Sequence, residues 1–168
     1  MSQTRDLLAK VANKDSVAFQ QFYDQFADRV YRYAFTILRD KHLAEEIAQE
    51  TMVAVWNGAD RFAGRSKAST WIFGIARNQA FTLLRKEKRA ENVPVPELIQ
   101  TDPSKSIIQR EHVMTALNEL SADHREVVYL TFYEGLSYGE ISGILGIPAG
   151  TVKSRMFHAK RKLAEALT

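Results

Sequence analysis

The sequence predicts an all-α protein built from two small helical domains. Apolar residues recur at spacings of three and four almost throughout the 168 residues, which is the period of an α-helix. Three of the four prolines fall within one polar stretch, residues 87–105. Such a stretch is typical of an extended linker rather than of a loop inside one core. We therefore expect one domain at residues 1–86, a flexible linker at 87–105 and a second domain at 106–168.

The composition limits the classes of protein to consider. Apolar residues make up 45% of the chain, which is enough for packed cores, and there is no cysteine for a disulfide or a thiolate metal site. None of the four histidines has a second ligand-type residue at a recognised metal spacing, and no catalytic motif is found. We expect no signal peptide, because the first residues are polar, and no apolar run is long enough to span a bilayer. We expect a cytoplasmic protein that is not an enzyme and that needs no cofactor and no metal.

The first domain is expected to hold a short helix near residues 7–11 and three longer helices. The second helix carries an apolar stripe from Phe19 to Ile37, and Asp15 or Ser16 can cap its start. The aromatic residues of this stripe suit core packing better than base stacking, because their spacing places them on one face of the helix.

The third helix, residues 41–57, combines an apolar face with an acidic one. The polar members of that acidic face are Glu45, Glu46, Gln49 and Glu50. Two interpretations stay open here: a solvated face, which is common, or a docking surface for a basic partner.

Basic and polar side chains alternate with aromatic ones in the loop and helix between Arg61 and Lys88. Single-stranded DNA is bound by positive grooves with aromatic platforms, and a captured base needs amide and hydroxyl partners. Asn78, Ser66 and Ser69 offer such groups. Periodicity alone makes this a weak signal, because it favours a core position for Trp71.

The second domain contains a helix-turn-helix pattern. Ser137 and Glu140 have the spacing of a capping box, which marks a helix start. Gly146 stands where a left-handed C-cap is expected, and Pro148 suits the first turn of a new helix. The last helix carries five basic residues between Pro148 and Leu163 and no acidic one. A turn followed by a basic helix is the shape and charge of a reader of the DNA major groove.

One face of this last helix offers base-reading side chains, and its second half offers phosphate contacts. The opposite stripe, with Val152 and Met156, is expected to pack on the domain. The predicted DNA contacts are Thr151, Lys153, Ser154, Arg155, Phe157, His158, Lys160 and Arg161.

Taken in order, these motifs resemble those of the extracytoplasmic-function (ECF) sigma factors, the small two-domain class of bacterial transcription initiation factor. In the first domain the resemblance rests on residues 44–51 (AEEIAQET) and 69–78 (STWIFGIARN). In the second it rests on residues 135–141 (GLSYGEI) and 150–155 (GTVKSR). It covers nearly the whole chain.

The resemblance implies that the chain binds core RNA polymerase and directs it to promoters. The second domain is expected to read the −35 element as duplex, and the first to melt the −10 element and capture a non-template base. The expected −10 contacts are Phe62, Gly64, Arg65, Ser66, Lys67, Ser69, Asn78, Thr82 and Arg85. The expected polymerase contacts are Glu45, Glu46, Gln49 and Glu50.

The resemblance further implies an anti-sigma protein as a partner and no contact with a membrane. The alternative is a stand-alone helix-turn-helix regulator whose N-terminal half senses a ligand or dimerises. Such a protein binds duplex operators without polymerase, usually as a dimer on paired half-sites.

Overall fold

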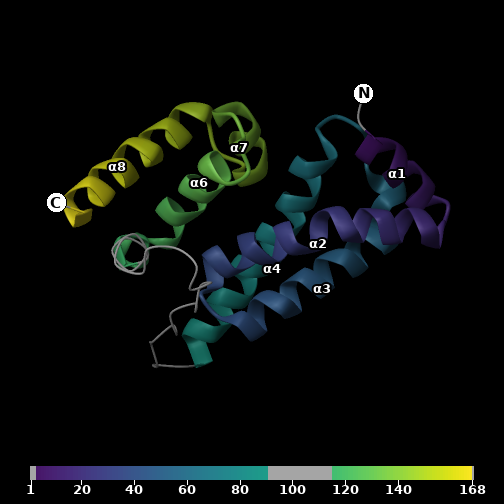
Figure 1. Ribbon diagram of the computed structural model, residues 1–168, viewed down its shortest axis with the longest axis horizontal. Coiled ribbons are helices and arrows are strands. Elements are labelled where there is room, and N and C mark those ends of the chain that lie inside the picture. The colour runs from purple at the N-terminus through teal and green to yellow at the C-terminus, as the bar shows by residue number, and fades with distance from the viewer. Residues whose placement is uncertain (1–2, 91–114, 168) are drawn as a thin grey trace, which may run out of the picture.

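A computed structural model of the chain describes residues 3–90 and 115–167, and it confirms the all-α prediction. Helices and no strands occur in these two ranges (Figure 1). The helices are α1 (Gln3–Ala12), α2 (Ser16–Leu38), α3 (Lys41–Gly58), α4 (Ala68–Ala90), α6 (Ala122–Phe132), α7 (Tyr138–Leu145) and α8 (Ala149–Leu167), with a 3-10 turn η1 (Ala59–Arg61). Most of the predicted linker lies outside the described residues. Helix α4 continues to Ala90, four residues beyond the predicted end at Lys86.

Helices α1 to α4 form the first module, with α2 packed against the other three (Figure 1). Asp15 is the cap that begins α2, since its side chain accepts hydrogen bonds from the backbone N–H groups of Val17 and Ala18. Phe22 and Phe26 are buried and their rings stack at 4.7 Å between centroids. The aromatic stripe of α2 is therefore core, as its periodicity predicts.

Helices α6, α7 and α8 form the second module, and α7 and α8 make the predicted helix-turn-helix. Ser137 and Glu140 complete the capping box at the start of α7, each accepting a backbone hydrogen bond of 3.1 Å from the other. Gly146 ends α7 with a left-handed φ of 69°. The carbonyl of Pro148 then accepts a bond of 2.9 Å from the N–H of Thr151 in the first turn of α8.

The two modules pack against each other, which the sequence does not predict. Helix α2 contacts α6, and α4 contacts α7. At the centre lies Glu126, whose side chain is fully buried. Its carboxylate accepts a hydrogen bond of 2.8 Å from Tyr33 Oη and bonds of 3.1 Å from Nε and Nη2 of Arg77. Burial raises the pKa of Glu126, and the hydrogen bonds and charge of Arg77 act in the opposite direction.

Further polar contacts surround this centre. Arg29 pairs with Glu134 at 2.8 Å, and Arg125 Nε donates to the carbonyl of Thr36 at 3.0 Å. The ring of Tyr129 stacks on that of Tyr33 at 5.8 Å. Because donors and acceptors come from different modules, these contacts hold the modules in one relative orientation.

We expect Glu126→Ala to lower the free energy of unfolding by about 3 kcal/mol, because it leaves the guanidinium of Arg77 largely buried and unpaired. Urea unfolding followed by circular dichroism measures this change. Glu119→Ala removes an exposed carboxylate just before α6 and should change the free energy of unfolding by less than about 0.5 kcal/mol. Equal effects of the two substitutions would contradict the central role of Glu126.

The turn between α7 and α8 depends on the left-handed backbone of Gly146. Gly146→Ala should lower the free energy of unfolding by about 1 kcal/mol, because an L-residue is strained at positive φ. A Cβ there would meet no atom within 4 Å, so backbone strain is the whole effect. Gly150→Ala is the matched control: its Cβ also meets nothing, and it lies within α8, where alanine is favoured. It should leave stability unchanged or slightly higher.

Candidate nucleic-acid interface

Helix α8 presents a basic face to solvent and an apolar face to its module. Val152, Met156 and Ala159 are buried, so this helix is fixed in rotation about its own axis. That rotation leaves six of the predicted DNA contacts exposed. They are Lys153, Ser154, Phe157, His158, Lys160 and Arg161. Thr151 is half-buried.

Arg155 differs from the other basic residues of α8. Its side chain is 26% exposed, and its Nη1 lies 3.7 Å from Oδ1 of Asp123 on α6. The two groups are too far apart for a hydrogen bond, but the guanidinium lies against its own module in the free protein. The nearby imidazole of His124 has a pKa lowered by burial first, then by the charges of Lys162 and other cations. A positive potential therefore surrounds this end of the module, as anion binding requires.

The loop between η1 and α4 carries five of the nine predicted −10 residues, and Ser69 follows in the first turn of α4. Arg65, Ser66 and Lys67 are exposed, whereas Phe62 and Ser69 are half-buried. The ring of Phe62 lies 5.4 Å from that of Trp71, which also is half-buried. This contact packs the start of the loop against α4.

Gly64 gives the loop its sharp bend, with a φ of 73°. The carbonyl of Gly64 lies 3.5 Å from Nη2 of Arg5 on α1. A Cβ at this position would come within 2.2 Å of the same nitrogen, so any side chain would displace Arg5. Glycine therefore allows both the positive φ and the close approach of α1.

On α4, Asn78, Thr82 and Arg85 form one exposed stripe. They are linked to one another: Thr82 Oγ1 donates to the carbonyl of Asn78 at 2.7 Å, and Arg85 Nη2 donates to Thr82 Oγ1 at 3.3 Å. The side-chain amide of Asn78 makes neither bond. This amide belongs to an exposed residue.

The acidic face of α3 lies beside this stripe. All four of its predicted members, Glu45, Glu46, Gln49 and Glu50, are exposed. A hollow of about 310 Å³ is lined by Glu46 and Glu50 from α3 and by Asn78 and Thr82 from α4, among others. The structure thus brings together residues that the sequence assigned to different partners.

The packing of the modules also places the predicted −10 loop beside α7, the first helix of the helix-turn-helix. Lys67 Nζ from the −10 loop lies 3.0 Å from Oε2 of Glu140 on α7. The hydrogen bond from Lys67 is the largest cause that lowers the pKa of Glu140. Thr70 at the start of α4 approaches Gly143 of α7. In this arrangement the helix-turn-helix covers one edge of the loop.

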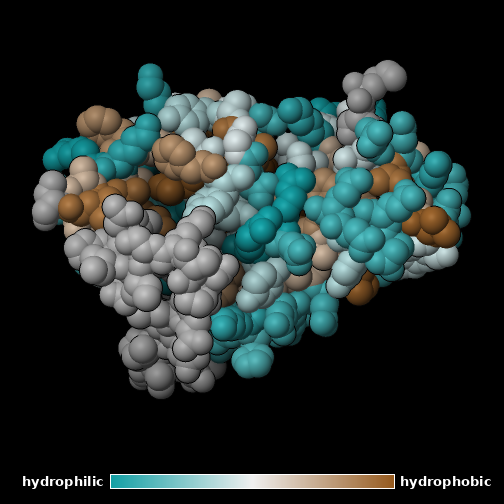
Figure 2. All heavy atoms as spheres, viewed as in Figure 1, coloured by the Kyte–Doolittle hydropathy of each residue, from teal (hydrophilic) through white to brown (hydrophobic). Residues whose placement is uncertain are grey.

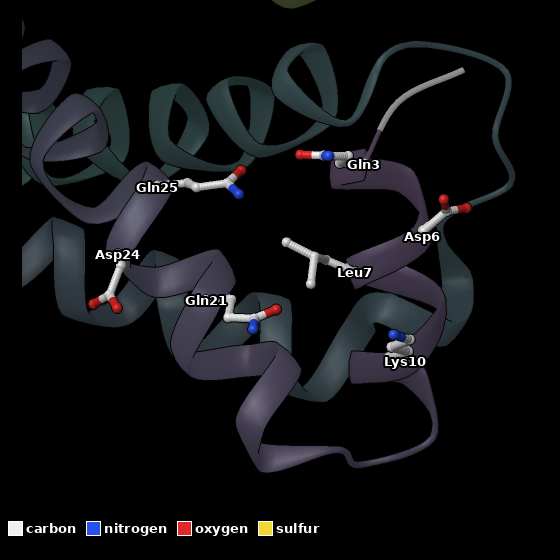
Figure 3. Close-up of a pocket in the computed structure, with 7 residues that line it drawn as sticks. All are labelled: Gln3, Asp6, Leu7, Lys10, Gln21, Asp24 and Gln25. Carbon is white, nitrogen blue, oxygen red and sulfur yellow. The ribbon is translucent and has the colours of Figure 1, made fainter.

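Figure 2 shows hydrophilic residues across most of the middle of one face, with hydrophobic ones chiefly toward its two ends. A hollow of about 560 Å³ lies between α1 and α2. Figure 3 shows the residues that line it, which are mostly polar and include Asp6, Lys10 and Asp24. Within the described ranges, no three His, Asp or Glu residues are grouped to hold a metal ion.

Among residues 3–90 and 115–167, no helix combines the length and apolar character needed to cross a bilayer.

Two family models match the chain, one for each module. Sigma-70 region 2 matches residues 22–90, and Sigma-70, region 4 matches residues 110–163. Among curated relatives, the ECF RNA polymerase sigma factor SigK of Mycobacterium tuberculosis is 32% identical over 171 residues, which cover 96% of this chain and 91% of that protein. SigL of the same organism is 32% identical over 160 residues, with 90% of each chain covered.

Solved structures agree with these relatives. The sigma factor RpoE of Bartonella quintana, in complex with the anti-sigma factor NepR, superposes with a TM-score of 0.78 at 30% identity. The match covers 89% of this chain and 96% of that one. CnrH, in complex with the cytosolic domain of CnrY, has the same fold, with a TM-score of 0.76 at 24% identity. The chain belongs to the ECF sigma factors of RNA polymerase.

Proposed function

We propose that this chain binds core RNA polymerase and directs it to promoters through two DNA contacts. Helix α8 reads the −35 element as duplex, and the −10 loop with α4 opens and holds the −10 element. The observation that carries the proposal is the presence, in one sigma-family chain, of two DNA-suited surfaces on separate modules. One is the basic face of α8, and the other is the polar stripe of α4.

The side chains of α8 suit the major groove. Arginine reads guanine through two hydrogen bonds, serine adapts to several bases, and an aromatic ring contacts the thymine methyl group. Arg155, Ser154 and Phe157 provide these three chemistries within one turn. Lys160 and Arg161 follow at the distal end, where phosphate contacts would set the register of the helix.

The surface of the first module suits unpaired DNA. A flipped base is recognised by hydrogen bonds to its edge, and the strand is attracted by positive charge. Asn78 supplies an exposed amide, while Arg65, Lys67 and Arg85 supply the charge. These groups extend from the loop before α4 to the last turns of that helix, so a single strand running along α4 would meet all of them.

The acidic face of α3 is the proposed polymerase contact. Three exposed carboxylates within two turns suit a basic partner surface. The polymerase carries out the nucleotidyl transfer, and this chain contributes binding rather than catalysis. We infer that the protein acts in the cytoplasm, where polymerase and chromosome meet.

The proposal requires the modules to separate. The −10 and −35 elements lie about 25 base pairs apart, on the order of 85 Å of duplex. In the packed arrangement, Lys67 and Glu140 of the two modules are only 3.0 Å apart. The Glu126 contacts must therefore break when both elements are bound. An anti-sigma protein, like the one that accompanies the RpoE relative, would act by favouring the packed form.

Reconstitution with core polymerase tests the function. The full chain should co-purify with the core enzyme, and the complex should give run-off transcripts from a subset of promoters in a randomised library. The chain alone should bind the same duplexes weakly. Strong binding to paired half-sites without polymerase would indicate a stand-alone regulator instead.

Arg155→Ala tests base reading by α8. In the holoenzyme it should weaken promoter binding by about 1–3 kcal/mol and relax the preference at one base pair of the −35 element. Lys160→Ala is the matched control for a phosphate contact. It should weaken binding uniformly across sequences, and it should reduce by about 1 the slope of log binding constant against log salt concentration. Competition binding on single-base promoter variants separates the two effects. An unchanged base preference in Arg155→Ala would exclude its proposed role.

A further inference from the structure

A cavity of about 350 Å³ lies between the two modules, at the place where α2 faces α6. Its walls are mainly carbon. Tyr31 and Phe35 contribute from α2, and Val128 and Tyr129 contribute from α6. Three arginines also line it: Arg32, Arg39 and Arg125. A mostly apolar hollow with a few convergent polar groups, at the lower end of the usual size range, is typical of small-molecule sites.

Arg39 is the unusual residue of this cavity. It is only 8% exposed, and no described group hydrogen-bonds to its Nε or Nη2. Its nearest described favourable contact is the ring of Phe35, at 5.7 Å from the guanidinium carbon to the ring centroid. The backbone of Arg39 is held by the C-cap of α2, where its N–H donates to the carbonyl of Phe35 at 2.8 Å. A buried charge without a counter-ion is costly, so such an arrangement is expected to serve a ligand.

Arg125 adds a second positive charge to the same wall. Burial, and after it the charge of Arg39, lowers the pKa of Arg125 to about 10. Its Nε and Nη1 are fixed by the carbonyls of Thr36, at 3.0 Å, and Leu120, at 2.6 Å. The guanidinium is therefore held in place before any ligand arrives. Two adjacent cations against an apolar wall favour an anion with an apolar body.

We propose that this cavity binds a small amphipathic carboxylate, with its carboxylate on Arg39 and Arg125 and its apolar body against Tyr31, Phe35 and Val128. Planar guanidinium groups match the geometry of a carboxylate. The volume suits a single medium chain or ring system. An acidic helix from another protein would need a longer groove, so the size of the cavity favours a small molecule.

Both modules build the walls, so the ligand would bind only when they are packed. Binding therefore shifts the population toward the packed form. Since the proposed function needs the modules apart, the ligand would lower promoter-dependent transcription. This second step rests on the proposed function, whereas the binding itself does not.

Decanoate is the probe for binding, used with the full chain below its micellar concentration. Isothermal titration should show saturable binding of one decanoate per chain, and the thermal midpoint should rise with decanoate concentration. Decanol, which lacks the charge, and acetate, which lacks the apolar body, should each bind at least about tenfold more weakly. Equal binding of decanol and decanoate would overturn the proposal, and so would an acidic peptide that binds where decanoate does not.

Variants of the full chain test the role of Arg39. Arg39→Gln should weaken decanoate binding at least about tenfold, because a charge-assisted hydrogen bond is lost. Lys41→Gln removes an equal charge from a nearby exposed position outside the cavity and should bind as the natural chain does. If Arg39→Gln does not fold, Arg39→Lys keeps the charge without the planar fork and should bind with intermediate affinity. Unchanged affinity in a folded Arg39 variant would refute the site.

The distance between modules tests the effect on packing. Because the natural chain has no cysteine, dyes placed at Asn57→Cys and Ala166→Cys label one exposed position in each module. Energy transfer between the two dyes reports the population of the packed form. Decanoate should increase this energy transfer in the full chain, and Arg39→Gln should abolish the increase. Binding without a change in energy transfer would overturn the conformational part alone. If neither the natural chain nor the variants give run-off transcripts with core polymerase, with or without decanoate, that result would instead count against the proposed function.

Discussion

The buried carboxylate of Glu126 is the constraint on which the arrangement of this protein depends. A carboxylate removed from water must be paired and hydrogen-bonded, and its partners here come from the other module. Tyr33 of α2 and Arg77 of α4 supply three hydrogen bonds between them. Satisfying this one group therefore fixes α6 against two helices of the first module.

The same constraint shapes the DNA surfaces. Arg77 precedes Asn78 on α4, so the helix that would hold the −10 strand is also the helix that holds Glu126. With α6 packed in this position, Lys67 of the loop forms an ion pair with Glu140 of α7. When the two modules separate, these charged groups become hydrated again. The hydration offsets much of the lost pairing energy, so the interface fixes a geometry while contributing a modest net free energy. Contacts that the chain makes with polymerase and promoter can therefore supply enough binding free energy to separate the modules.

Much of the local structure was predictable, because its determinants are close in sequence. The capping box of Ser137 and Glu140, the left-handed Gly146 and the buried stripe of α8 depend on spacings of a few residues, and all are confirmed. The aromatic stripe of α2 was likewise predicted as core and is confirmed. The individual roles of the DNA- and polymerase-facing residues stay predictions: the structure places most of them on the surface but holds no partner.

The sequence by itself determined the helices, their caps, the buried stripes and the family motifs, since each is a local or periodic pattern. Tertiary structure alone decided that the modules touch, that Arg155 rests on Asp123, and that Arg39 and Arg125 share a cavity. The partners in the central contact are 93 and 49 residues apart along the chain. No periodicity relates positions so far apart. The residues next to Glu126 on α6 give no local sign that Tyr33 and Arg77 of the other module will surround its carboxylate.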